Sequence, residues 1–331
     1  MTTIKEVAQL ANVSVATVSR VINKVDNVSY LTKERVEKAI EELHYKPNDV
    51  ARTLFQGNSN MVALFVPDIT NPYYPELARA IEDVMNQHGL TFILCNTDDS
   101  YEKEQTYLKN LEQKKIDGII MSSSSISKQD AKRISAPIVT LDRKVGMDLP
   151  SVTVDNYKGA CQAMEHLRNI GCRRIAHIRG PLRDKNAGER LEGFLDMVKD
   201  ENWFDSTYVQ SGEYSYETAV QATFELLKKN PEVDGVFVAN DLMAAGVLKA
   251  AIEMKKIIPD DMAVISFDGI NLSKTTIPTL STMAQPIYEM GSTAANMIIE
   301  QLKEPSKKIK SKVFDTELME RQSTRREDTV L

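Results

Sequence analysis

The apolar positions of the first 45 residues repeat with the period of short amphipathic helices. Thr3 and Glu6 are spaced as a capping box, so a helix is predicted from there to about residue 10. A turn at residues 11–13 precedes a second helix over 14–23, and a third runs from about 31 to 43. The pattern predicts a three-helix core. Its inward residues in the second and third helices are Val18, Val21, Ile22, Val36, Ile40 and Leu43.

From residue 61 the pattern changes to short apolar runs that alternate with amphipathic helices. The predicted strands are 62–66, 91–95, 118–121, 138–141, 174–178, 236–239 and 264–267. The predicted helices are 75–88, 102–114, 157–169, 189–201, 216–229, 242–254 and 287–302. Repeated βα units imply open parallel sheets, and this number of units predicts an α/β domain of two doubly wound lobes. We expect the lobes to divide near 149–151, with the C-terminal strands returning to the first lobe.

The outward face of the second predicted helix is unusual for a solvated helix, which would carry more Lys and Glu. It presents two small apolar side chains, Val15 and Ala16, beside Ser19, Arg20 and Asn23. These groups suit a thymine methyl, a guanine edge and phosphate oxygens. Together with the helix before it, this helix forms a helix-turn-helix pattern. The pattern alone is moderately specific, because such helix pairs are common in proteins that never meet DNA.

The net charge of -6 is distributed unequally between the N-terminal 60 residues and the rest of the chain. Residues 1–60 hold eight Lys or Arg against seven Asp or Glu, a balance of +1, so the remainder carries -7. Binding to DNA must therefore depend on the placement of a few groups and on two headpieces acting together.

The remaining composition favours a soluble cytoplasmic protein without a metal or other cofactor. Cys95, Cys161 and Cys172 lack metal-type spacing, so structural burial in a reducing compartment is expected. The N-terminus has no apolar signal core, and no run approaches the ~20 apolar residues of a membrane helix. No motif for dinucleotide, phosphate-loop, serine-hydrolase or zinc-protease chemistry occurs, which argues against an enzyme.

Three blocks of sequence, residues 3–8, 13–23 and 45–54, closely resemble the headpiece of the LacI/GalR family of bacterial transcription repressors. The resemblance implies a DNA-binding headpiece over 1–46, a hinge helix and linker over 47–60, and an effector-binding and dimerisation domain over 61–331. It also implies a homodimer on a palindromic operator, with Leu54 wedged into the minor groove and Arg52 near the phosphates. The predicted DNA-binding residues are Thr3, Ser14, Val15, Ala16, Thr17, Arg20, Asn23, Arg52 and Leu54.

Polar side chains follow most of the predicted strands, and ligands of open α/β sheets bind at the carboxyl ends of strands. Carboxylates, amides and guanidiniums there can form paired hydrogen bonds with vicinal hydroxyls, and tyrosine rings can cover the faces of a sugar. The same set, in the same order, resembles the periplasmic ribose-binding protein, whose fold the effector domain of the family shares. The resemblance implies sugar contacts from Asn71, Tyr73, Tyr74, Asp142, Arg143, Arg190, Tyr214, Asn240, Asp268 and Gln285. Asp241 is expected instead to cap the helix over 242–254.

Three points stay open at the level of the sequence. The effector is ribose, a related pentose or its phosphate, since Arg143 and Arg190 could meet a phosphate. An alternative inside the family is a catabolite-control-type regulator, which responds to a phosphorylated carrier protein. Whether the effector releases DNA or promotes its binding is also open.

Overall fold

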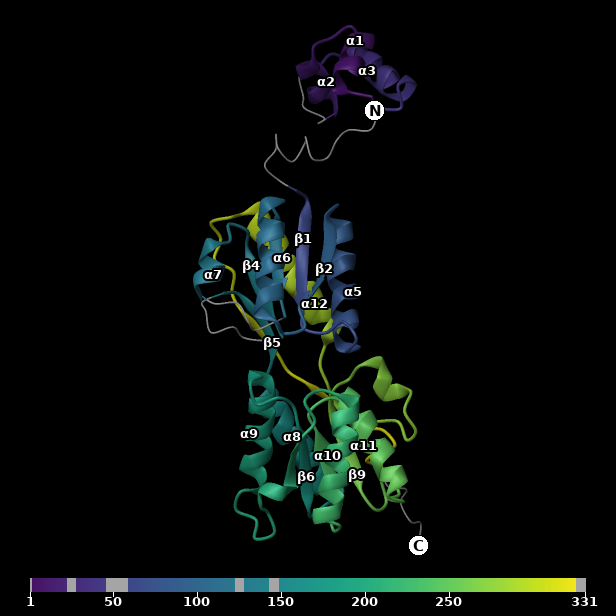
Figure 1. The fold of residues 1–331 in the computed structure, drawn as a ribbon, viewed down its shortest axis with the longest axis vertical. Helices are drawn as coiled ribbons and strands as arrows, with labels where there is room; N and C mark the ends of the chain where they lie inside the picture. The colour runs from purple at the N-terminus through teal and green to yellow at the C-terminus, as the bar shows by residue number, and fades with distance from the viewer. Residues whose placement is uncertain (1, 23–27, 46–58, 123–127, 143–148, 326–331) are drawn as a thin grey trace. The chain divides into compact units, whose positions relative to one another are not determined.

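The computed structural model describes residues 2–22, 28–45, 59–122, 128–142 and 149–325. The chain forms two compact units, Met1–Ser59 and Asn60–Leu331, shown as ribbons in Figure 1.

The first unit contains three helices: α1 (Ile4–Leu10), α2 (Val15–Ile22) and α3 (Tyr30–Glu42). The capping box is formed, since the Glu6 amide donates to Thr3 Oγ1 at 3.4 Å and the Thr3 amide donates to Glu6 Oε2 at 2.6 Å. At the start of α2, Ser14 Oγ accepts from the Thr17 amide at 3.1 Å. The buried apolar core of this unit is Val7, Ala8, Ala11, Val18, Val21, Val36 and Ala39.

The second unit contains two six-stranded sheets, whose strand orders are β11-β5-β4-β3-β1-β2 and β12-β10-β9-β8-β6-β7. Neighbouring strands are parallel except β10 and β12. The first sheet comprises β1 (Met61–Val66), β2 (Thr91–Asn96), β3 (Gly118–Met121), β4 (Ile138–Leu141), β5 (Ser151–Val154) and β11 (Lys312–Phe314). The second comprises β6 (Ile175–Arg179), β7 (Val209–Ser211), β8 (Gly235–Val238), β9 (Ala263–Asp268), β10 (Ser281–Ala284) and β12 (Glu317–Met319).

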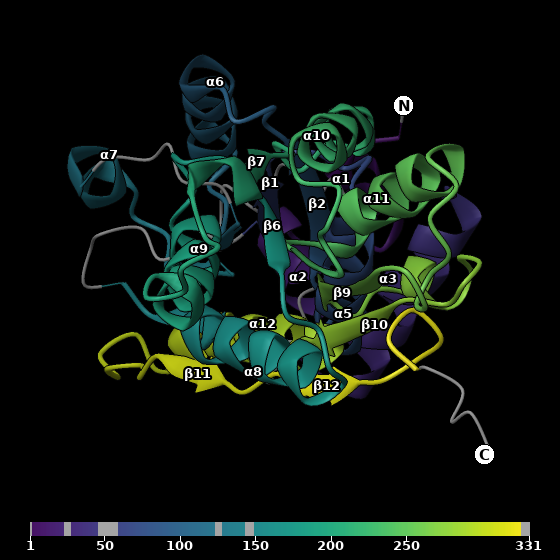
Figure 2. The same cartoon turned by 90° about the horizontal axis from the view of Figure 1, so that it is seen from below.

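Helices lie against both sheets and define two lobes (Figure 1), of which the second is nearer the viewer in Figure 2. The first lobe contains α5 (Tyr73–Gln87), α6 (Tyr101–Gln113), α7 (Lys128–Arg133) and α12 (Ile287–Lys303). The second lobe contains α8 (Asn156–Asn169), α9 (Lys185–Val198), α10 (Tyr216–Lys229) and α11 (Asp241–Glu253), with 3₁₀ turns at Ser206–Tyr208 and Asn271–Lys274. Gly291 lets α12 lie close against α5, because a Cβ there would be 2.9 Å from the Leu77 carbonyl oxygen. No helix in the described ranges is long and apolar enough to cross a membrane.

The predicted division of the lobes near 149–151 falls a few residues too early. β5 belongs to the first sheet, so the chain crosses to the second lobe only after Val154. It returns after β10 to form α12 and β11, and crosses once more to end in β12. The strand β5 was missed because its sequence, SVTV, alternates apolar and polar residues over only four positions, although all four are buried.

Burial of the cysteines is only partly as expected: Cys95 and Cys172 are buried, whereas Cys161 on α8 is half-buried. His177 on β6 is fully buried, with its ring stacked between Phe194 and Phe237 at centroid distances of 5.1 and 4.7 Å. Its Nδ1 lies 2.9 Å from the Phe237 carbonyl oxygen. Burial lowers the pKa of His177 to about 3, so this imidazole is neutral in the folded chain.

His177 should make the second lobe sensitive to acid. Its depressed pKa means that, between about pH 6.5 and about pH 3, the unfolded chain binds a proton that the folded chain does not. Stability contributed by the neutral ring is therefore present above about pH 6.5 and is lost as the pH falls. At pH 5 the loss is about 2 kcal/mol.

Urea unfolding at about pH 7.5 and 5, followed by the fluorescence of the single tryptophan, Trp203, measures this effect. His177→Phe should flatten the pH dependence by about 2 kcal/mol. An unaltered pH dependence in His177→Phe would contradict the assignment.

Candidate functional site

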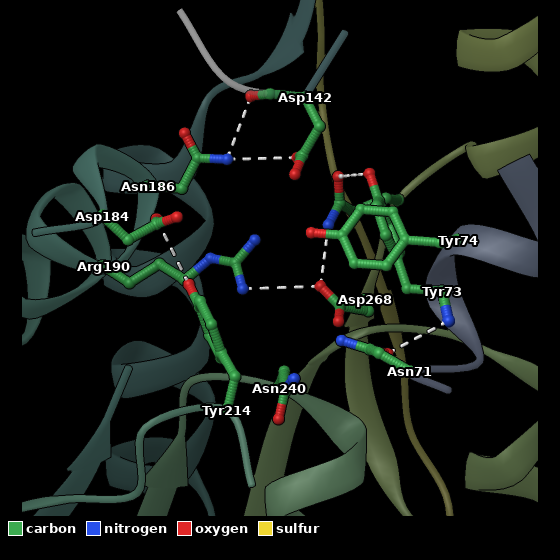
Figure 3. A pocket seen from close by; sticks show the side chains of 11 residues that line it. Asn71, Tyr73, Tyr74, Asp142, Asp184, Asn186, Arg190, Tyr214, Asn240 and Asp268 are labelled. Atoms are coloured by element: carbon green, nitrogen blue, oxygen red, sulfur yellow. Dashed lines mark hydrogen bonds and ion pairs between the residues drawn. The ribbon is translucent and has the colours of Figure 1, made fainter. Parts of the chain in front are cut away.

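The carboxyl ends of the central strands of both sheets face a polar cavity between the two lobes (Figure 3). Its volume is about 30 Å³, so the lining side chains leave only a narrow space between them. The described residues that line it are Asn71, Tyr73, Tyr74, Asp142, Asp184, Asn186, Arg190, Tyr214, Asn240, Asp268 and Gln285. The structure thus brings together nine of the ten predicted effector residues, while Arg143 lies outside the described residues.

The first lobe supplies an aromatic wall and a carboxylate. Tyr73 and Tyr74, in the first turn of α5, meet edge to face with ring centroids 5.3 Å apart. Asn71 stands just before them, and its Oδ1 accepts from the Tyr73 amide at 3.2 Å. Asp142 directly follows β4 and adopts a left-handed backbone conformation with φ of 67°, which Asp tolerates better than most residues.

The second lobe supplies a buried guanidinium, Arg190 on α9. Its Nε donates to Asn156 Oδ1 at 2.9 Å, and its Nη1 donates to the carbonyl of Ala239 and lies 3.4 Å from Asp268 Oδ1. The guanidinium carbon is 3.8 Å from the centre of the Phe267 ring, so the guanidinium also forms a cation–π contact with this ring. These contacts fix Arg190 at the cavity wall before any ligand arrives.

Asp268, at the end of β9, joins this guanidinium to the first lobe. Gln285 Nε2 donates to Asp268 Oδ1 at 2.8 Å, and the Tyr73 hydroxyl donates to Gln285 Oε1 at 3.4 Å. Burial raises the pKa of Asp268, helped by the nearby carboxylates of Asp241 and Asp142 and opposed by Arg190. Burial also raises the pKa of Tyr73 well above its usual value, so its hydroxyl stays protonated as a donor.

The predicted role of Asp241 as the cap of α11 is wrong. Asn240, not Asp241, caps this helix, with its Oδ1 accepting from the Met243 amide at 2.9 Å. Asp241 is the first helical residue and is fully buried, where its carboxylate accepts from Thr282 Oγ1 and from the Ile270 amide, each at 2.8 Å, and from Ser266. Asp241 thus links β9 to β10 through Ser266 and Thr282. An Asn-Asp pair allows either residue to be the cap, which is why the sequence could not decide.

Two residues of the cavity, Asp184 and Asn186, were missed from the sequence. Asn186 Nδ2 donates to the backbone carbonyl of Asp142 at 3.0 Å and to its carboxylate at 3.1 Å, which joins the two lobes. Asp184 caps α9 and lies 3.4 Å from the Tyr214 hydroxyl. Both residues belong to the segment that follows β6, so the rule that identified the other residues would also have found them.

The described residues that are predicted to contact DNA lie on α2, directly before α2 and directly before α1. Ser14, Val15, Ala16 and Arg20 are exposed, Thr17 is half-buried, and Thr3 is exposed at the start of α1. Asn23, Arg52 and Leu54 lie outside the described residues.

A three-helix unit with a helix-turn-helix, followed by a two-lobed α/β domain with a cavity between the lobes, defines a ligand-controlled transcription regulator. Residues 3–48 match the model of "Bacterial regulatory proteins, lacI family", and residues 164–324 match a "Periplasmic binding protein-like domain". The chain is 43% identical to the ribose operon repressor of Halalkalibacterium halodurans, with 98% of each chain aligned. The protein belongs to the lacI family of bacterial regulators.

Solved structures agree with this membership. The lac repressor dimer bound to operator and the anti-inducer ONPF has a TM-score of 0.86 at 27% identity, covering 98% of this chain and 99% of the other. A LacI family regulator from Enterococcus faecium with bound ribose has a TM-score of 0.72 at 30% identity, covering 80% of this chain and 98% of the other. The protein is a DNA-binding transcriptional repressor and not an enzyme.

Arg190→Gln should destabilise the ligand-free protein in a pH-dependent way. At about pH 8 the buried carboxylate of Asp268 loses its counter-ion, and we expect a loss of about 3 kcal/mol in the free energy of unfolding. At about pH 6 the loss should be smaller, because without Arg190 the already raised pKa of Asp268 rises further and the carboxyl binds a proton.

Urea unfolding at the two pH values measures the difference. Arg168→Gln is the matched control, since Arg168 forms a surface ion pair with Glu201 and its loss should cost about 1 kcal/mol or less at either pH. Equal losses for Arg190→Gln at both pH values would show that Asp268 does not respond to the guanidinium.

Proposed function

We propose that the cavity binds a small sugar of the pentose class, with ribose the first candidate, and that sugar binding releases the repressor from its operator. The observation that carries the proposal is the convergence of carboxylates, amides, a guanidinium and tyrosines from both lobes on one small cavity. The relative named as a ribose operon repressor and the structural neighbour with bound ribose support the same ligand.

The geometry around the cavity leaves a mixed set of donors and acceptors. Because Asn71 and Asn240 accept backbone N–H groups through Oδ1, each keeps its Nδ2 as a donor. Asp142 and Asp268 offer acceptors, and Arg190 offers donors. Sugar hydroxyls both donate and accept, so vicinal hydroxyls match such a set better than a purely apolar or purely ionic ligand would.

We propose that the protein acts in the cytoplasm as a homodimer bound to a palindromic operator. One headpiece with a net charge of +1 offers few phosphate contacts, so tight binding requires two headpieces. The similar lac repressor structure is a dimer bound to operator. Ile252, Ile257 and Ile277 remain exposed on the second unit, which is consistent with surface that a second copy covers.

Contacts between the lobes provide the means of control. Asn186 reaches Asp142, Arg183 lies 3.8 Å from Asp99, and the Asn271 amide donates to Glu76 Oε1 at 2.8 Å. A sugar held by both lobes must favour one angle between them. Since β1 of the first lobe directly follows the proposed hinge over 47–60, the angle sets the spacing of the two hinges in a dimer.

Asp142→Ala tests the proposed function directly. This carboxylate belongs to the first-lobe side of the cavity, so its loss should abolish the release of operator by ribose. Operator affinity measured by fluorescence anisotropy, with and without saturating ribose, gives the response of each variant. Asp315→Asn, which changes an exposed ion pair with Lys158, should respond like the parent protein. Normal release by Asp142→Ala would contradict the site, and no response of the parent protein to pentoses would favour control by a phosphorylated carrier protein.

Arg20→Ala tests the proposed reading of the operator. Because Arg20 is the basic residue on the exposed face of α2, its loss should cost about 1–3 kcal/mol and relax the preference at one base pair. Leu54→Ala should weaken binding to operators that kink easily, with less change in base preference. Equal losses for the two variants across a panel of operator sequences would show that these roles are wrong.

A further inference from the structure

We propose that the cavity accepts the uncharged sugar and rejects its phosphate esters. The inference rests on the proposed function, because it concerns which form of the sugar the same cavity binds.

Three helices begin at the cavity, and the N-terminus of a helix is ordinarily a favourable place for a phosphate. In each of these helices, a backbone amide of the first turn already donates a hydrogen bond to a side chain that lines the cavity. Asn71 accepts from the first amide of α5 at 3.2 Å, Asp184 accepts from the Ala187 amide of α9 at 2.9 Å, and Asn240 accepts from the Met243 amide of α11 at 2.9 Å. Each helix therefore already uses one of its first amides for a side chain of the cavity, and Asp184 is itself an anion.

The charges of the described cavity residues point the same way. Three carboxyl groups, on Asp142, Asp184 and Asp268, line the cavity with one guanidinium, on Arg190, while Arg143 lies outside the described residues. This guanidinium is already engaged by Asn156, Ala239 and Asp268. A phosphate would have to compete with Asp268 for it while lying near the other carboxylates, and like charges at short range in a buried site repel strongly.

A wider groove of about 540 Å³ adjoins the cavity and shares Asn71, Tyr74 and Tyr214 with it. An extension of the sugar toward solvent would enter this groove. Its described lining contains five carboxylates, on Asp68, Asp98, Asp99, Glu213 and Glu217, and one guanidinium, on Arg183. Three of the carboxylates have cationic partners, since Asp99 lies 3.8 Å from Arg183, Glu213 lies 3.8 Å from Arg179, and Asp98 pairs with Lys103. A phosphate on the sugar therefore meets negative charge on this side as well.

With this selectivity, the effector is the sugar before a kinase phosphorylates it. A kinase that phosphorylates the sugar consumes the effector, and its product does not act on the repressor. The regulator then reports the supply of free sugar and not the pool of sugar phosphates.

Titration calorimetry of the full-length chain with D-ribose and with D-ribose 5-phosphate tests the proposal. In about 0.1 M salt we expect the ester to bind at least 100-fold more weakly. Higher salt should narrow the ratio, because it screens the charges of the open groove.

The double variant Asp99→Asn, Glu213→Gln removes two groove carboxylates that lie outside the sugar cavity and leaves Arg183 and Arg179 without these partners. Because Asp99 also contacts Arg183 of the other lobe, the readout is the affinity for the ester relative to that for ribose. The variant should raise this ratio about 3–10-fold through the loss of partly screened repulsion. Asp99 has a φ of 51°, a conformation that Asn also tolerates. The matched control is Glu225→Gln, Glu253→Gln, which removes two exposed carboxylates paired with lysines on α10 and α11 and should leave the ester affinity unchanged.

Each outcome bears on one of the two proposals. The inference would be overturned, while the proposed sugar site stands, if the ester bound as tightly as ribose. It would also be overturned if the groove variant left the affinity for the ester, relative to that for ribose, unchanged. Failure of both ligands to bind the parent protein would overturn the proposed site and the inference with it.

Discussion

The structure of the second unit depends on a buried ion pair at the point where its two lobes meet. Arg190 and Asp268 lie 3.4 Å apart with almost no solvent exposure. Removing two such charges from water is costly, and a well-packed apolar pair would often stabilise a protein as much or more. We interpret the pair as retained for function, because it aims a guanidinium and a carboxylate at the cavity.

The partners of this pair are placed at the crossings between the lobes. Asn156, which holds Arg190, comes just after the chain leaves β5, and Gln285, which holds Asp268, comes just before it enters α12. Tyr73 of the first lobe completes the connection through Gln285. A ligand that changes the contacts of the pair therefore acts on the segments about which the lobes would rotate. This arrangement supplies a physical link from the cavity to the first lobe, where the chain leads to the DNA-binding unit.

Features set by local physics could be predicted from the sequence. The capping box at Thr3 and Glu6 and the apolar strand cores such as 118–121 were correctly identified, because caps and long apolar runs leave a local signal. The residues of the cavity were found because parallel strands place their carboxyl ends together. Strands of only three or four residues, such as β5 and β12, leave no such signal, and their place depends on neighbours distant in sequence. The choice of Asn240 over Asp241 as the helix cap, and the contact of Asn186 with Asp142, are likewise decided by tertiary packing.

The central claim is that sugar and operator compete through the angle between the lobes. Two such sites must affect each other equally, so titrating ribose into the free repressor and into the repressor saturated with operator tests the claim most directly. The account predicts that operator weakens ribose binding by the factor by which ribose weakens operator binding, a coupling of about 1–3 kcal/mol or about 5- to 150-fold. Equal ribose affinities in the two titrations would contradict the account, and tighter binding of ribose on operator would make the sugar a corepressor.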